Sequence, residues 1–357
     1  MDRFRRGGDP SGEEELEEYP LNRSQERDYP EDFRGDIFYW DIDKTYLATE
    51  FETLSGLVST SLEMAADKRS IAGTDVLLRA LRRGKRPEEM QSNPIYFVSA
   101  SPCQLRRVIE EKMLMDGVEF DGITFKDHMG LLRSGRVRQM RYSIPYKLTA
   151  LLLYRKELPW TVREVLFGDD SESDALIYAL YGDVVSGRLR GDDLVRSLQK
   201  NDVTDSESER VAELAEGLPA QDIVHRIYIN LEMGTAPHNF HPWGSTLVPC
   251  QNAFQMALHL CADGLLPAEA ACRVGGALIA EHDHRPAGLL HDAVDLVDRG
   301  LVTVGWLGTL WPELQDQGLV PPYLALPAER APDEAPTRRV SMTDYLTPLN
   351  HLSVDET

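Results

Sequence analysis

The stretch IFYWDIDKTYLA, residues 37–48, is where the chain first indicates its fold. The large apolar residues 37–40 are typical of a strand that is covered on both faces. Asp41 and Asp43 follow this run, and they point the same way if the extended path continues, because side chains alternate along a strand. Two nearby carboxylates repel each other unless a cation lies between them. The stretch therefore predicts either a polar turn after a strand or part of a ligand site at a strand end.

The pattern that follows alternates between apolar runs and helix signals as far as residue 232. The expected strands are 37–40, 95–98, 122–125, 163–167 and 224–232. The expected helices are 74–83, 101–116, 144–158 and 171–182. Thr74 and Ser101 are predicted as N-caps, and Gly84 as a helix stop. Strands that alternate with helices predict an α/β fold, with a parallel sheet covered by helices on both faces.

The two ends of the chain differ from this middle part. Residues 1–34 are rich in Glu, Arg, Gly and Pro without a period, so they are expected to be a flexible N-terminal tail. Residues 35–232 form the expected α/β domain. Residues 233–326 contain several helix-like segments bounded by Gly or Pro, which predict a helical C-terminal region. Residues 327–357 resemble the N-terminal tail and are expected to be largely flexible.

Composition excludes several classes of protein. The chain has 357 residues and a formal net charge of -21, which argues against stable nucleic-acid binding because that binding needs many Lys and Arg. The start of the chain has no apolar run typical of a secretory signal, and no stretch approaches the roughly 18 apolar residues of a membrane span. The four cysteines have no CxxC spacing and are expected to be reduced. We expect a cytoplasmic protein without a transmembrane segment, although the basic segments 79–86 and 133–141 leave peripheral membrane contact open.

Polar side chains occur at three of the predicted strand ends. Asp41 and Asp43 follow the first strand, Ser99 ends the second, and Asp169 begins an acidic cluster after the fourth. Lys147 lies in the helix before that last strand. Carboxylates, a hydroxyl and a lysine suit phosphoryl transfer with Mg²⁺, which prefers oxygen ligands, at a site that offers donors and positive charge to the phosphoryl oxygens.

In these residues the chain resembles the haloacid dehalogenase (HAD) superfamily of phosphatases. The first motif of that superfamily corresponds to residues 41–45 (DIDKT), the second to Ser99, the third to Lys147 and the fourth to residues 168–174 (GDDSESD). The resemblance implies a three-layer Rossmann-like core, and a phosphatase that hydrolyses phosphomonoesters through an aspartyl-phosphate intermediate.

A narrower resemblance connects YFVSASPCQL, residues 96–105, to the catalytic domain of actin-patch-associated phosphatidate phosphatases and their bacterial relatives. It implies a phosphatidate-type lipid as one substrate. Two positions depart from that family's pattern. Lys44 stands where the family usually has an acidic residue, and Asp170 stands where GDSG has serine. These departures leave the identity of the phosphorylated substrate open.

The superfamily resemblance also implies the catalytic roles. Asp41 is the nucleophile, and Asp43 is the general acid and then the base for water. Ser99 donates a hydrogen bond to a phosphoryl oxygen. Lys147 neutralises the phosphate and the nucleophile, with Lys126 as a rival for this third motif.

The implied cofactor is Mg²⁺. Its ligands are expected to come from Asp41, from the backbone carbonyl of Asp43, and from the acidic cluster. In that cluster Asp169 is the expected ligand with Asp170 as the alternative, and Asp174 supports the metal shell. As structural alternatives, Asp169 and Asp170 are also suited to the start of the following helix, where carboxylates are favoured.

Other interpretations stay open from the sequence. The same fold would suit a scaffold protein that binds phosphate without catalysis, or a phosphotransferase whose acceptor is not water. Residues 49–70 are a candidate small cap over the site. Histidines recur at spacings that also occur in zinc or transition-metal sites, although a structural role is favoured for them: His238, His241, His282, His284 and His291.

Overall fold

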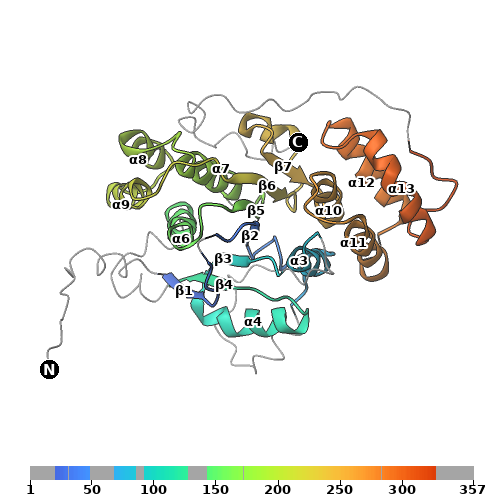
Figure 1. Cartoon of the computed structure of the whole chain (residues 1–357), viewed down its shortest axis with the longest axis horizontal. Coiled ribbons are helices and arrows are strands. Elements are labelled where there is room, and N and C mark those ends of the chain that lie inside the picture. The colour runs from blue at the N-terminus through green and yellow to red at the C-terminus, as the bar shows by residue number, and fades with distance from the viewer. Residues whose placement is uncertain are drawn as a thin grey trace.

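A seven-stranded sheet runs through the middle of the computed structural model (Figure 1). The structure describes residues 21–30, 32–48, 68–85, 92–127, 143–171, 173–282 and 284–326. The strands are β1 (Leu21–Gln25), β2 (Asp36–Trp40), β3 (Ile95–Pro102), β4 (Gly122–Lys126), β5 (Arg163–Asp169), β6 (Val224–Asn230) and β7 (Leu247–Cys250). Their order across the sheet is β1-β4-β3-β2-β5-β6-β7, and every pairing is parallel except that of β1 with β4. The expected α/β fold with a Rossmann-like parallel sheet is confirmed.

The central position of β2 follows from its sequence. Residues 37–40 are at most 1% exposed, because this strand is flanked by β3 and β5 and covered on both faces. Phe38 and Trp40 pack into one hydrophobic core, and Ile37 and Tyr39 pack into the other. A continuous apolar run therefore fills both cores at once, and it carries the following residue, Asp41, to the carboxyl edge of the sheet.

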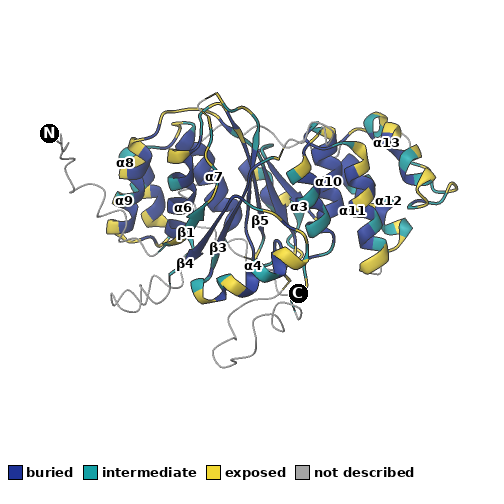
Figure 2. Ribbon diagram, turned by 60° about the horizontal axis from the view of Figure 1, so that its bottom comes forward, coloured by how far each residue is buried: buried dark blue, intermediate teal, exposed yellow. Residues whose placement is uncertain are grey.

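Helices cover both faces of the sheet, as Figure 2 shows. On the face that Ile37 and Tyr39 fill lie α6 (Ile144–Glu157), α7 (Asp174–Val185), α8 (Gly191–Lys200) and α9 (Asp205–Glu216). On the other face lie α3 (Thr74–Arg83), α4 (Arg106–Met115), α10 (Ala253–Ala262), α11 (Ala268–Glu281), α12 (Pro286–Asp298) and α13 (Val304–Asp316). Two 3-10 helices complete the described elements, η3 (Cys103–Leu105) and η5 (Pro237–Trp243).

Two strands lie outside the segment expected to hold the sheet. β1 falls within the expected N-terminal tail and pairs with β4, and the guanidinium of Arg106 binds its Asn22 and Ser24 side chains. β7 lies beyond residue 232 and extends the sheet next to β6. Both are short edge strands, and β1 is also polar, so neither produces a strong apolar signal. Residues 21–25, which fall within the expected N-terminal tail at residues 1–34, form a strand in the structure.

The helical C-terminal region shares a core with the sheet. The helices α10 and α11 pack against α3, and their apolar residues join those of β2 and β7 in one cluster. A Cβ atom at Gly73, just before α3, would lie only 2.5 Å from Cδ1 of Leu278 in α11. Residues 327–357, expected to be flexible, lie outside the described residues.

Two predicted helix caps are wrong. Thr74 is the first residue of α3 and Gly73 precedes it as the N-cap, so the Thr74 hydroxyl donates to the carbonyl of Ile71 at 2.8 Å instead. β3 continues through Ser101 to Pro102, and α4 begins only at Arg106. Gly84 does end α3, with a φ of 73°.

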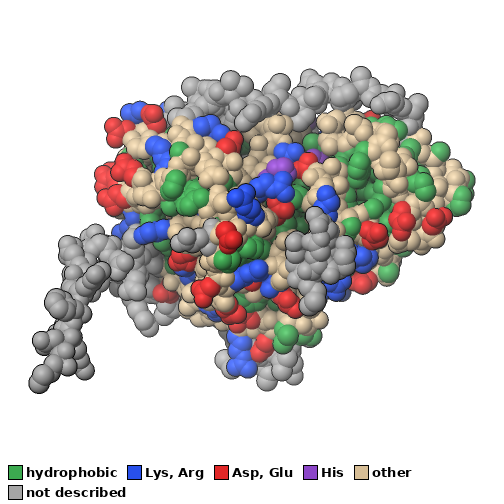
Figure 3. Space-filling model, in the orientation of Figure 1, with side chains coloured by type: hydrophobic (Ala, Val, Ile, Leu, Met, Phe, Trp, Pro, Cys, Tyr) green, Lys and Arg blue, Asp and Glu red, His purple; other side chains and the backbone are tan. Residues whose placement is uncertain are grey.

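The surface carries no single sign of charge on the face drawn in Figure 3, where acidic and basic side chains are interspersed. In the described part of the chain, none of the helices combines the length and the apolar character that crossing a bilayer demands. The four cysteines are free thiols, and three of them are buried.

Candidate active site

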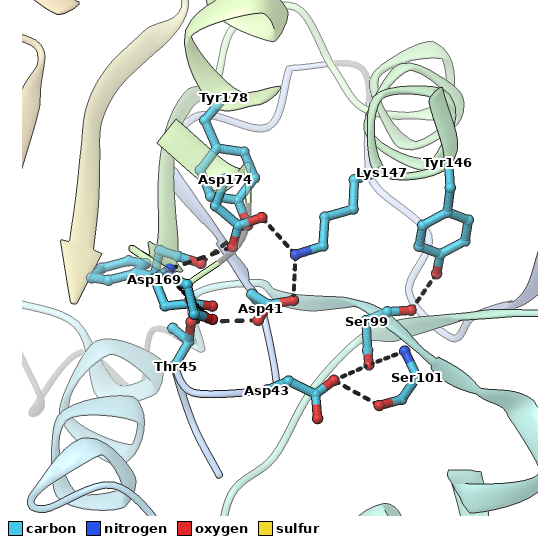
Figure 4. A network of polar contacts seen from close by, with 12 residues as sticks. Asp41, Asp43, Thr45, Ser99, Ser101, Tyr146, Lys147, Asp169, Asp174 and Tyr178 are labelled. Atoms are coloured by element: carbon cyan, nitrogen blue, oxygen red, sulfur yellow. Dashed lines mark hydrogen bonds and ion pairs between the residues drawn. The ribbon is translucent and has the colours of Figure 1, made fainter. Parts of the chain in front are cut away.

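Polar side chains from five elements meet at the carboxyl edge of the sheet (Figure 4). Asp41 follows β2, Asp169 ends β5, and Ser99 lies near the end of β3. Lys147 comes from the first turn of α6, and Asp174 is the first residue of α7. Parallel strands end at one edge of a sheet, so residues far apart in the sequence become neighbours here.

The ammonium of Lys147 lies between two carboxylates. Its Nζ is 2.8 Å from Oδ1 of Asp41 and 2.5 Å from Oδ1 of Asp174. All three side chains are at most 1% exposed. Removing such charges from water is costly, so they are stable in the interior only when they are paired and hydrogen-bonded. The structure therefore brings together the predicted nucleophile and the predicted third motif, and it places Lys147 rather than Lys126 between the carboxylates.

Tyr146 fixes the beginning of α6 against the sheet. Its hydroxyl donates to the carbonyl of Ser99 at 2.6 Å and to that of Thr124 at 3.1 Å. These bonds join α6 to β3 and β4 at the position where Lys147 enters the site. Lys126, the rival lysine, is buried at the end of β4 with its Nζ 5.7 Å from the centre of the Tyr146 ring.

Three carboxylates form a group suited to a metal ion. Each of Asp41, Asp169 and Asp174 offers an oxygen, and these oxygens all lie within 4.8 Å of one another. All three residues are buried. Three negative charges lie around the single ammonium of Lys147, so a further cation would relieve the repulsion between them. A set of hard oxygen donors with excess negative charge fits Mg²⁺ well.

A glycine gives Asp174 the room that it occupies. A Cβ at Gly168 would collide with the Asp174 carboxylate and would lie 2.7 Å from the ring of Tyr178. Asp174 can therefore approach the end of β5, where its Oδ2 accepts from the backbone N–H of Asp169 at 3.4 Å. Burial, and then the charge of Asp174, raises the pKa of Tyr178, whose hydroxyl donates to the carbonyl of Phe167.

Asp43 is held by two serines rather than one. Its Oδ2 accepts from Oγ of Ser99 at 3.2 Å and from Oγ of Ser101 at 2.6 Å, while Oγ of Ser99 accepts from the N–H of Ser101. Asp43 is half-buried and Asp41 is fully buried, so the two aspartates differ in their access to solvent. The sequence interpretation missed Ser101 by treating it as a helix cap. Its spacing of two from Ser99 along a strand is the signal that places both on one face.

The turn after β2 holds Asp41 and Asp43 in place. The N–H groups of Tyr46 and Leu47 both donate to the carbonyl of Ile42, at 3.0 and 2.8 Å. The hydroxyl of Thr45 donates to Oδ2 of Asp41 at 3.4 Å. Both oxygens of the predicted nucleophile thus have a polar neighbour.

Asp170 lies outside the carboxylate group. Its Oδ1 accepts from the N–H of Met233 at 2.8 Å and its Oδ2 from the N–H of Thr235 at 3.0 Å. The neighbouring Asp169 instead accepts at Oδ1 from the N–H of Ser171 at 2.5 Å. Because consecutive side chains at a strand end point to opposite sides, only one of the two can face Asp41. In this structure Asp170 therefore binds the loop after β6 and lies outside the group formed by Asp41, Asp169 and Asp174.

The histidines do not assemble into a comparable group. In the described residues, the only cluster of three or more His, Cys, Asp or Glu side chains with metal-site spacing is that of Asp41, Asp169 and Asp174. His284 instead pairs with Asp292, with 3.0 Å between Nε2 and Oδ2. Most of the candidate cap, residues 49–67, and the basic segment 133–141 lie outside the described residues.

Residues 40–189 match the family model described as "Phosphatidate phosphatase APP1, catalytic domain". The matched segment begins at the end of β2, contains all four motif positions, and ends after α7. The predicted relation to these phosphatases is confirmed for this segment, and it indicates a phosphatase catalytic domain. No curated protein and no solved structure matches the chain at a significant level.

Proposed function

Starting from the match of residues 40–189 to a phosphatidate phosphatase catalytic domain, we propose that the protein is a Mg²⁺-dependent phosphatase of the HAD type. It hydrolyses phosphomonoesters through an aspartyl-phosphate on Asp41. The observation that carries the proposal is the buried ammonium of Lys147 between Asp41 and Asp174, with Asp169 beside them. This arrangement places a carboxylate nucleophile beside an ammonium group that can face the phosphoryl oxygens as they gain negative charge.

In the first step, a carboxylate oxygen of Asp41 attacks the phosphorus atom, and the bond from phosphorus to the ester oxygen breaks. Asp43 in its protonated form gives its proton to that leaving oxygen, so the product leaves as an alcohol. Lys147 stays beside Asp41 and offsets the charge that collects on the phosphoryl oxygens. Ser99 and Ser101 hold the Asp43 carboxyl group in one orientation.

In the second step, Asp43 as a carboxylate takes a proton from a water molecule. That water attacks the phosphorus of the aspartyl-phosphate, and the bond between phosphorus and the Asp41 oxygen breaks. Inorganic phosphate is released, Asp41 returns to its carboxylate form, and Asp43 is protonated again. The half-buried position of Asp43 suits this role, because one side chain must face both the leaving group and water.

Asp41, Asp169 and the backbone carbonyl of Asp43 would hold the Mg²⁺ ion, with Asp174 next to them. When bound, the ion supplies positive charge that stabilises the phosphoryl oxygens. The substrate we would test first is phosphatidate, which the name of the matched family model suggests. The compartment we propose is the cytoplasm.

The direct test is phosphate release from phosphatidate and from an aryl phosphate. We expect turnover that requires Mg²⁺, stops with a chelator, and falls at least about 10⁴-fold in Asp41→Asn, because that variant lacks the nucleophile. Asp193→Asn, which changes an exposed aspartate on α8, is the matched control and should keep the wild-type rate. Equal turnover in Asp41→Asn and the wild type would contradict the proposal.

A further inference from the structure

Lys44 and Met233 meet at the rim of the site. Nζ of Lys44 lies 3.8 Å from Sδ of Met233, which is 54% exposed. Met233 belongs to the loop that the Asp170 carboxylate binds through the N–H groups of Met233 and Thr235. Lys44 follows Asp43 directly, and Asp170 follows Asp169 directly. The two loops that carry the site residues therefore also build its rim.

The backbone of Lys44 is fixed in an uncommon conformation. Its φ is 57°, a left-handed value that few residues other than glycine adopt. Its N–H donates to the carbonyl of Leu47 at 2.8 Å, and its carbonyl accepts from Nδ2 of Asn230 at 3.1 Å. Both backbone groups are thus held by other parts of the chain, and the lysine side chain leaves the turn in a set direction. A constrained residue of this kind at a functional site suggests a role in positioning.

Lys44 is a positive charge beside a strongly acidic site. Asp41, Asp169 and Asp174 gather negative charge at the edge of the sheet, and the whole chain carries a net charge of -21. Lys147 is fully buried between carboxylates, whereas Lys44 is half-buried and lies at the boundary with solvent. The negative charge of the site repels an anionic substrate as it approaches. A lysine at the rim offsets this repulsion most strongly when the substrate carries an anionic group close to that lysine.

We propose that Lys44 binds an anionic group on the leaving-group part of the substrate, with Met233 as the apolar wall beside it. The inference rests on the proposed function, in which Asp43 protonates the leaving oxygen. The leaving group must then lie beside Asp43, which directly precedes Lys44 in the chain. The substrate class is a phosphomonoester with a second anionic group, a carboxylate or a second phosphate, a few bonds from the phosphate that is removed.

Two matched aryl phosphates test this inference. 4-Carboxyphenyl phosphate carries the extra anion, and 4-carbamoylphenyl phosphate has nearly the same shape without the charge. The quantity to measure is the ratio of kcat/KM for the carboxylate ester to that for the amide ester. We expect Lys44→Met to lower this ratio about fivefold, as the loss of one partly exposed ion pair would. Lys44→Arg should keep most of the ratio, because it keeps the charge.

The control is Lys156→Met, which removes an exposed lysine near the C-terminal end of α6 and should leave the ratio unchanged. If the wild type hydrolyses both esters and Lys44→Met has the wild-type ratio, the role of Lys44 is overturned while the proposed function stands. If the folded, Mg²⁺-loaded wild type hydrolyses neither ester nor phosphatidate, the proposed function fails and this inference fails with it.

Discussion

Two buried charge clusters lie at opposite ends of the same helix and the same strand. At the carboxyl end of β5, Lys147 of α6 contacts Asp41 and Asp174. At the amino end of β5, Arg155 of α6 pairs with Glu164 at 2.7 Å, and both side chains are fully buried. Burial and chain position therefore do not distinguish them, and the difference lies in how their charges and hydrogen bonds are balanced.

The Arg155–Glu164 pair is balanced in charge. One positive and one negative charge face each other, and the hydroxyl of Tyr181 donates to Oε2 of Glu164 at 2.6 Å. The guanidinium also donates to the carbonyls of Leu158 and Pro159. The cluster around Lys147 instead places one ammonium among three carboxylates. A charge excess of this kind indicates a binding site, whereas a balanced pair indicates a structural role.

We expect the greatest loss of stability when the Arg155–Glu164 pair is disrupted. Arg155→Met leaves the Glu164 carboxylate buried without its cation, so we expect a loss of about 3–5 kcal/mol in the free energy of unfolding, with or without Mg²⁺. Urea unfolding measures it, and Lys156→Met on the exposed side of α6 is the control. If Arg155→Met does not fold, Arg155→Met/Glu164→Leu removes both charges and should recover stability. A loss below 1 kcal/mol, equal to that of the control, would refute the structural role.

A third buried polar contact, between Tyr228 and His259, predicts a pH dependence of stability. Nδ1 of His259 lies 2.9 Å from the Tyr228 hydroxyl, and burial lowers the pKa of His259 from 6.5 to about 4. Between these values the unfolded chain binds the proton more readily, so stability should fall as the pH drops from about 6.5 to about 4, by about 3 kcal/mol. In His259→Asn, the free energy of unfolding should depend much less on pH across this range, as unfolding curves recorded at several pH values would show. If the free energy of unfolding of that variant falls with pH as steeply as that of the wild type, groups other than His259 cause the fall.

A somewhat smaller effect is expected at the unbalanced cluster. Mg²⁺ at about one hundred times its Kd should raise the free energy of unfolding by about 2.7 kcal/mol, because only the folded chain presents the three carboxylates together. Thermal unfolding with and without Mg²⁺ measures this stabilisation. Asp169→Asn should lose it, and Asp170→Asn should keep it, since the Asp170 carboxylate binds the loop after β6. If Asp170→Asn loses the stabilisation by Mg²⁺ and Asp169→Asn keeps it, Asp170 rather than Asp169 binds the ion.

Much of the fold could be predicted because its central strands are strongly apolar. The runs in β2, β3 and β5 are buried on both sides, so each predicts a covered strand by itself. The edge strands β1 and β7 escaped prediction because each is short and is held by one partner strand. Ser101 was assigned to a helix cap because a serine before proline is also typical of a helix start, and only the path of β3 decides between the two.

The amino-acid sequence alone was enough to predict the kind of chemistry that we propose for the site. The residue types at the strand ends, and their order, predict an acidic phosphoryl-transfer site without any contact being known. Which of these residues lie next to one another is visible only in the folded chain. Lys147 rather than Lys126 contacts Asp41, Asp169 rather than Asp170 lies in the carboxylate group, and Lys44 lies against Met233. The physical reason is that the pairing of parallel strands and the packing of α6 and α7 set these neighbours, and both depend on contacts between residues far apart in the chain.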